Sequence, residues 1–175
     1  MDLLHFDPEP LYFDDPLPEG VLALLEAAGE RYGEAEAETL LEQAHAAAPD
    51  HLMVLVARYR YFFYRHRLAE ADAVVWQAVA VVAARLGLPA DGRGLDEERI
   101  AAAAQRSMTL TRFYLSALKA AAYVRLRRGE TAGAVRLLET LVRVDQADRL
   151  GGQALLHIAH NRQSEEAGEL AELDH

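Results

Sequence analysis

Two stretches of the chain decide its fold class. Residues 36–50 read EAETLLEQAHAAAPD, and residues 68–87 read LAEADAVVWQAVAVVAARLG. Both are rich in residues that favour helices, and each ends at a proline or a glycine that would stop a helix. Small and apolar residues recur in them 34 positions apart: Ala37, Leu41 and Ala44 in the first, and Ala71, Val75 and Ala78 in the second. A period of this length indicates a repeated helical hairpin.

A third copy of the pattern occurs further along the chain. Its three equivalent positions are Ala134, Leu138 and Leu141. They follow the second copy by 63 residues, so an insertion of 29 residues, from Leu86 to Tyr114, interrupts the array. The insertion contains a loop, LPADGRG, and then Asp96 as a helix N-cap. Residues 96–128 form either one continuous helix or two helices with a break near Ser107 to Thr111, and the apolar period leaves both open.

The two ends of the chain differ from this helical body. Residues 1–18 hold four prolines among acidic and apolar residues, which predicts an extended N-terminal arm. Residues 19–166 are expected to form the helical domain, and the helix after Asp145 is expected to cap it. Residues 167–175 are acidic and are expected to be a frayed tail. The sequence therefore predicts an all-α fold with an extended arm.

The three copies resemble the tetratricopeptide repeat family over about 100 residues. The small residues Ala37, Ala71 and Ala134 stand where paired helices of that family approach each other closely. The Trp, Leu-Gly and Tyr of the family's first helix are replaced, in the second copy by Leu55, Tyr59 and Phe62. The resemblance implies a curved array of about three antiparallel helix hairpins whose first helices line a concave peptide-binding face.

The resemblance also implies which side chains line that face. From the second and third copies, the expected peptide-groove residues are Arg60, Phe63, Tyr64, Lys119, Tyr123 and Arg127. The first copy would contribute Leu22, Glu26 and Glu30, which oppose the positive charge. Arginine and aromatic side chains suit an acidic or aromatic segment of another protein.

Composition and charge exclude several other classes of protein. The chain has no cysteine, no secretory signal pattern and no apolar run long enough to span a membrane, so we expect a cytoplasmic protein. The net charge is -10, but residues 1–50 hold thirteen Asp and Glu against Arg31 alone, while residues 51–160 hold sixteen Lys and Arg against ten acids. Either an acidic segment lies on a basic surface, in this molecule or in a neighbour, or unrelated faces are simply solvated.

Two local groups of residues are of types that can bind nucleic acid or metal. The run RYRYFFYRHR at residues 58–67 mixes basic and aromatic residues as binders of single-stranded nucleic acid do. On a helix, however, Tyr59 and Phe62 should face the core, and a net charge of -10 argues against a polyanion. His157 and His160 could share a helix face, but no carboxylate stands at a matching spacing for a metal site. We expect no cofactor, no metal, no catalytic residue and no nucleic-acid partner.

The sequence thus favours an adaptor or chaperone-like module that binds a peptide segment of another protein, and not an enzyme. The alternative is a self-associating structural protein, in which the N-terminal arm of one subunit packs on a neighbouring subunit of a homo-oligomer.

Overall fold

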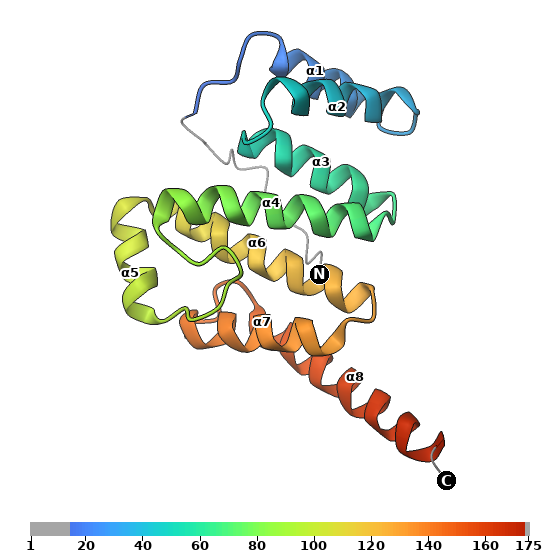
Figure 1. Ribbon diagram of the computed structural model, residues 1–175, viewed down its shortest axis with the longest axis vertical. Helices are drawn as coiled ribbons and strands as arrows, with labels where there is room; N and C mark the ends of the chain where they lie inside the picture. The colour runs from blue at the N-terminus through green and yellow to red at the C-terminus, as the bar shows by residue number, and fades with distance from the viewer. Residues whose placement is uncertain (1–14, 174–175) are drawn as a thin grey trace. The chain divides into compact units, whose positions relative to one another are not determined.

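The computed structural model describes residues 15–173 of the chain, and within that range the protein is all-α. Eight helices and no strand occur in this described part (Figure 1). The helices are α1 (Val21–Glu30), α2 (Glu36–Ala47), α3 (Leu52–Tyr64), α4 (Leu68–Leu86), α5 (Glu97–Arg106), α6 (Met108–Arg127), α7 (Thr131–Val144) and α8 (Gly152–Leu173). The predicted all-α class is therefore confirmed. None of the helices in this range is long and apolar enough to cross a membrane.

The described chain divides between Val81 and Val82, inside α4, into two compact units. The sequence predicted a single helical domain over residues 19–166 and gives no sign of this boundary. A division inside a helix leaves no proline, glycine or change of composition by which it could be recognised.

The first unit is built on the hairpin of α1 and α2, with α3 packed on α2. Val21, Ala44, Ala48 and Val54 form a buried apolar cluster, and the half-buried Leu17, Leu24 and Leu25 pack against it. Leu17 belongs to the predicted N-terminal arm, so the last residues of that arm pack on the first helices. Residues 1–14, which make up the rest of the arm, lie outside the described residues.

In the second unit, α6 packs against α5 and α7, and α7 packs against α8. The break between α5 and α6 resolves the alternative that the sequence left open over residues 96–128. The hydroxyl of Ser107 accepts a hydrogen bond from the amide of Leu110 at 3.2 Å, which caps α6 and separates it from α5. Asp96 caps α5 as predicted, since its carboxylate accepts a hydrogen bond from the amide of Arg99 at 2.8 Å.

The loop between α4 and α5 packs on this unit, because Gly92 and Leu95 are buried and the Tyr114 hydroxyl donates a hydrogen bond of 2.6 Å to the Pro89 carbonyl. The acidic segment from residue 167 was expected to be a frayed tail, but α8 continues to Leu173. Helical propensity is high in this segment, so helix continues beyond the packed part of α8.

Candidate functional site

A cavity of about 630 Å³ opens between α1 and α3 in the first unit. Its lining residues are Leu25, Ala28, Gly29 and Tyr32 from α1 and the residues just after it, Leu41 from α2, and Ala57, Arg60, Tyr61 and Tyr64 from α3. We call this cavity the α1–α3 pocket. The spacing of three or four residues along each helix shows that one face of α1 and one face of α3 form its walls.

The lining of the α1–α3 pocket is apolar and aromatic with a single charge. Arg60 is the one charged side chain among the lining residues, and it is exposed. No described residue forms an ion pair or hydrogen bond with its guanidinium. Tyr32 and Tyr64 are also open to solvent, with 38% and 44% of their surface exposed. A bound molecule would therefore meet two aromatic rings and one unpaired cation.

The tyrosines of the pocket contact one another and are fixed by the packing around them. The rings of Tyr32 and Tyr61 meet edge to face with 5.9 Å between centroids, and the Tyr61 hydroxyl donates a hydrogen bond of 3.4 Å to Glu38. Partial burial raises the pKa of Tyr32 above its ordinary value, although the nearby positive charge of Arg65 opposes that shift. The Tyr32 hydroxyl therefore stays protonated at neutral pH and can donate a hydrogen bond.

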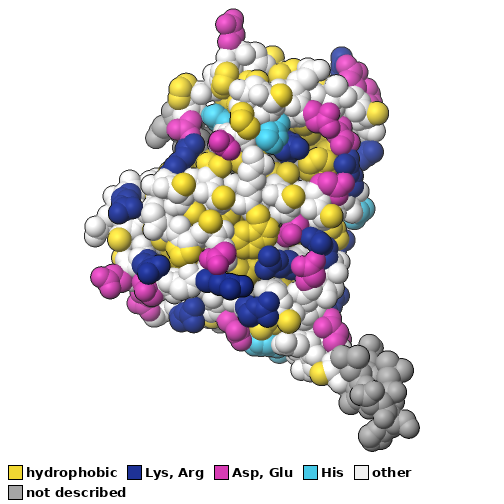
Figure 2. Space-filling view, in the orientation of Figure 1, with side chains coloured by type: hydrophobic (Ala, Val, Ile, Leu, Met, Phe, Trp, Pro, Cys, Tyr) yellow, Lys and Arg dark blue, Asp and Glu magenta, His cyan; other side chains and the backbone are white. Residues whose placement is uncertain are grey.

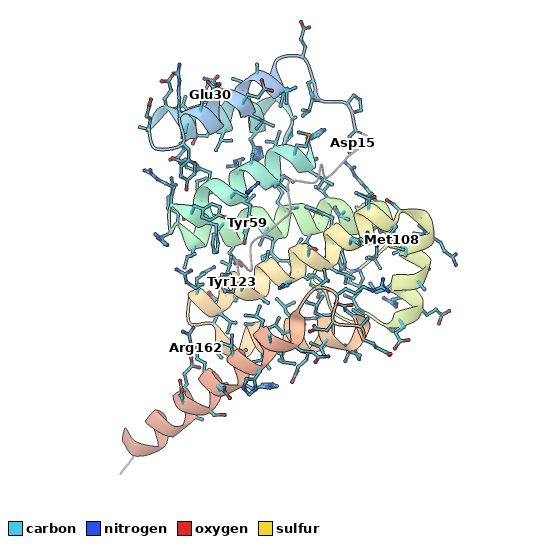
Figure 3. All side chains as sticks on the ribbon, turned by 180° about the vertical axis from the view of Figure 1, so that it is seen from behind. Asp15, Glu30, Tyr59, Met108, Tyr123 and Arg162 are labelled. Carbon is cyan, nitrogen blue, oxygen red and sulfur yellow. The ribbon has the colours of Figure 1, made fainter. Side chains whose placement is uncertain are left out.

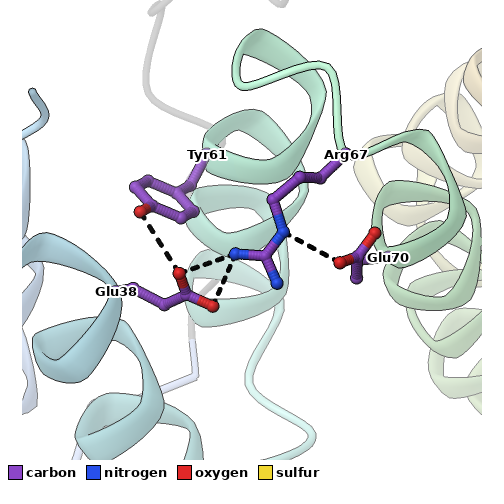
Figure 4. Close-up of polar contacts among 4 residues, drawn as sticks. All are labelled: Glu38, Tyr61, Arg67 and Glu70. Carbon is purple, nitrogen blue, oxygen red and sulfur yellow. Dashed lines mark hydrogen bonds and ion pairs between the residues drawn. The ribbon is translucent and has the colours of Figure 1, made fainter. Parts of the chain in front are cut away.

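An ion-pair network holds the end of α3 behind the pocket (Figure 4). Arg67 follows α3, and its Nη1 atom donates to both carboxylate oxygens of Glu38 on α2, at 2.6 and 2.7 Å. Its Nε atom donates to Glu70 on α4 at 2.8 Å. These hydrogen bonds raise the pKa of Arg67 above its ordinary value, so the guanidinium stays charged. The guanidinium of Arg67 thus links α2 and α4 at the residue where the chain leaves α3, next to the Tyr61 and Tyr64 wall of the pocket.

The structure places the sequence-predicted residues of the second copy at two different depths. Arg60 and Tyr64 line the α1–α3 pocket. Phe63, expected in the groove, is only 5% exposed and stacks on Tyr59 with 5.8 Å between ring centroids. Phe63 is therefore a packing residue, because the helix turns its ring about 100° away from that of Tyr64.

The remaining predicted groove residues belong to α6 in the second unit. The ammonium group of Lys119 donates a hydrogen bond to the Leu150 carbonyl, and burial lowers its pKa. Lys119 is half-buried and contacts the loop between α7 and α8 through this hydrogen bond. Tyr123 is half-buried and Arg127 is exposed. That Arg60, Tyr64, Tyr123 and Arg127 share one groove stays a prediction.

Sequence reasoning missed the contribution of α1 to the pocket. It chose Leu22, Glu26 and Glu30, which are exposed and do not line the cavity. The pocket is instead lined by Leu25 of α1 and by Tyr32, which follows that helix. An available signal was the apolar spacing from Leu25 through Ala28 to Tyr32, which marks one stripe of the helix.

The histidines have structural or surface positions. His51 is buried and caps α3, because its Nδ1 atom accepts a hydrogen bond from the Met53 amide at 3.3 Å. His157 and His160 are exposed on α8, where His160 lies 3.6 Å from a Glu139 carboxylate oxygen. Among the described residues, no group of three or more histidine, aspartate or glutamate side chains could hold a metal ion.

On the face of the molecule in Figure 2, acidic and basic side chains are interspersed.

No known protein-family model matches the sequence, and no solved structure matches the chain. One curated protein of Azotobacter chroococcum mcd 1 does match it and bears the name "Uncharacterized 19.8 kDa protein in nifW 5'region". The two sequences are 42% identical over 165 residues, which cover 94% of this chain and 92% of the relative. Identity at this level over nearly the full length of both proteins places this chain in the same family as the Azotobacter chroococcum protein.

Proposed function

We propose that the chain is a tetratricopeptide-like protein-interaction module, and that the α1–α3 pocket binds a peptide segment of a partner protein without changing it covalently. The observation that carries this proposal is the pocket itself, which is open and apolar and has one unpaired arginine at its wall. Concave sites with few, well-placed polar groups are typical of binding sites.

The small residues of the repeat pattern support the tetratricopeptide-like part of the proposal. Ala37, Ala71 and Ala134 are each 0% exposed. Ala37 lies in α2, which packs on α1, and Ala134 lies in α7, which packs on α6. A larger side chain at such a position would force the two helices of a pair apart. The repeat pattern requires small residues there for this reason, and the burial of all three alanines agrees with it.

The origin of the pocket walls gives a second line of support. The first helix of the first copy is α1 and the first helix of the second copy is α3, and both line the pocket. Leading helices of successive hairpins are the elements that the family resemblance assigns to peptide binding. The site would thus need only the first unit, and we assign no role in it to Lys119 or Phe63.

The lining also defines the chemistry of the partner segment. Tyr32 and Tyr64 offer ring faces and edges for an aromatic or large aliphatic side chain. Arg60 can form a two-point hydrogen bond with a carboxylate. No carboxylate, histidine or serine is among the lining residues of the pocket. The name of the Azotobacter relative gives a gene location, so the class of partner is argued from the pocket alone.

The test is a selection from a displayed library of random peptides, with the full chain as bait. We expect enrichment of peptides that combine an aromatic residue with an acidic one. The double variant Arg60→Glu, Tyr64→Ala should lose at least about 1.4 kcal/mol of binding free energy toward the enriched peptides, which is a tenfold weaker affinity.

The matched control is Arg136→Glu, which makes the same charge change at an exposed position of α7. It should bind the enriched peptides as the unaltered chain does. Thermal unfolding must show that the double variant is folded before its binding is compared. If the double variant binds the peptides unchanged, the α1–α3 pocket is not the binding site and the proposal is wrong.

A further inference from the structure

The first described residues of the chain are held at the N-terminal end of α3, the helix whose residues from Ala57 onward line the α1–α3 pocket. The Met53 amide donates to Nδ1 of His51, so the proton of this ring lies on Nε2, which donates to the Asp15 carbonyl at 3.0 Å. Asp15 consequently lies at the N-terminal end of α3 (Figure 3). Two residues later, Leu17 packs on the same apolar cluster as Leu25, and Leu25 also lines the pocket. The chain that precedes Asp15 therefore starts at the opposite end of α3 from Tyr64.

The N-terminal segment is long enough to reach every part of this site. Fourteen extended residues span at most about 50 Å. The thirteen residues of α3, from its His51 end to Tyr64, span about 20 Å. A segment that runs along α3 from Asp15 would reach the level of Arg60 after about five residues.

The composition of residues 1–14 complements the pocket. The segment has no Lys or Arg, and its acidic residues are Asp2, Asp7, Glu9 and Asp14. Its large apolar residues are Leu3, Leu4, Phe6, Leu11, Tyr12 and Phe13. The pocket is lined by Arg60, which no described residue pairs, and by the exposed rings of Tyr32 and Tyr64. Arg65 lies 5.8 Å from the centre of the Tyr61 ring. The segment thus has the acidic and aromatic chemistry that the pocket favours in a partner.

We infer that residues 1–14 of the same chain occupy the α1–α3 pocket and compete there with the partner segment, an inference that rests on the proposed function of the pocket. Attachment at Asp15 gives the segment an effective concentration on the order of 1 mM at the pocket. If its intrinsic dissociation constant is about 0.1 mM, it fills the pocket most of the time and weakens an external peptide about tenfold.

The first experiment measures contact within the full chain. The protein has no cysteine, so His5→Cys provides a single site for a nitroxide spin label. With the amide nitrogens isotopically labelled, we expect loss of the NMR signals of Gly29, Arg60 and Tyr64 when the nitroxide is oxidised. The loss should disappear in an Arg60→Glu background and persist with Arg136→Glu. If Arg60→Glu does not fold, Tyr64→Ala takes its place, since that ring is largely exposed.

A mixed sample separates the same chain from a second copy. It combines spin-labelled chains of natural isotopic composition with isotopically labelled chains that carry no nitroxide. If the segment binds its own chain, the NMR signals of Gly29, Arg60 and Tyr64 stay intact in this mixed sample. Their loss in the mixed sample would mean that the segment binds a neighbouring molecule, as in the self-associating alternative, and would overturn the inference.

The second experiment uses a fluorescent synthetic peptide with the sequence of residues 1–14 as probe. A full chain in which Asp2, Asp7 and Asp14 are changed to Asn and Glu9 to Gln should bind this peptide about tenfold more tightly than the unaltered chain. Equal affinity for the two chains would overturn the inference.

The two proposals can fail separately. If the library yields binding peptides but the spin-labelled chain shows no loss of NMR signal, the proposed function stands and the inference is wrong. If the spin-labelled chain shows the signal loss but no peptide is selected, even with the neutralised segment, the inference stands and the proposed function is wrong.

Discussion

At the scale of single residues, the loop between α4 and α5 shows why an acidic, glycine-containing stretch is ordered. Gly92 has a left-handed backbone, with φ at 70°, and is buried. A Cβ atom placed on it would lie 3.0 Å from Cδ2 of Leu118 and 3.4 Å from Cδ2 of Leu137. Gly94, two residues later, has a similar φ of 64° but no neighbour within 4 Å of such an atom.

This pair of glycines gives a matched prediction. Gly92→Ala and Gly94→Ala both place a side chain in the left-handed region, so both should lower the free energy of unfolding. Gly92→Ala must also displace Leu118 and should cost about 1–3 kcal/mol more than Gly94→Ala. Urea unfolding followed by circular dichroism measures the difference. Equal losses would mean that the loop does not pack on α6 as described.

At the scale of elements, the turn from α3 to α4 is fixed by electrostatics as well as packing. Arg67 joins Glu38 of α2 to Glu70 of α4, and its guanidinium lies 4.7 Å from the centre of the Phe62 ring. The hydrogen bond from Arg67 is the main cause that lowers the pKa of Glu70 below its ordinary value. The stabilisation that this ion pair gives to the turn should therefore be lost at acidic pH.

The sign of this sensitivity follows from the lowered pKa of Glu70. A carboxylate with a lowered pKa in the folded state stabilises the fold above its unfolded pKa, and the contribution is lost as the pH falls through the folded pKa. The stability difference between the unaltered chain and Glu70→Gln should thus be largest near about pH 6 and should shrink below about pH 4.

The control for the acid sensitivity is the same comparison in an Arg67→Gln background, where the donor is absent. Melting temperatures at several pH values, at one ionic strength, provide the measurement. A pH-dependent difference that persists without Arg67 would contradict the role given to this ion pair.

At the scale of the whole molecule, the candidate site is separable from the core that holds it. The outer wall of the pocket is made by Arg60, Tyr32 and Tyr64, which are all exposed. Its inner wall is made by Tyr61 and Leu41, which are buried. Binding and folding should therefore respond to different substitutions.

Tyr64→Ala and Tyr61→Ala test this separation on neighbouring turns of one helix. Tyr64→Ala should lower the free energy of unfolding by less than about 1 kcal/mol, because much of its ring is already in water. Tyr61→Ala removes a buried ring and the hydrogen bond to Glu38, and should cost about 3–5 kcal/mol. Similar losses for both would show that the pocket wall is part of the core.

Prediction from sequence was accurate where a local pattern carries the information. The N-cap at Asp96, the buried Tyr59 and Phe62, and the buried small residues of the 34-residue spacing follow from capping chemistry and helical periodicity. Of the predicted groove residues, Arg60 and Tyr64 line the α1–α3 pocket, and Tyr32, which was not predicted, lines it as well. Lys119 donates a hydrogen bond to the Leu150 carbonyl, 31 residues away, and a contact at this distance cannot be predicted from a local sequence pattern.

The sequence by itself determined that the described chain is all-helical, because helix propensity and apolar spacing act within a few residues of each position. Only the tertiary structure decided that α1 turns Leu25 and Ala28 toward the pocket that α3 also lines, and Glu26 and Glu30 toward solvent. The rotation of a helix about its own axis is set by the side chains of its neighbours. For α1 these lie on α2 and in the cluster around Val54, which are distant in the chain.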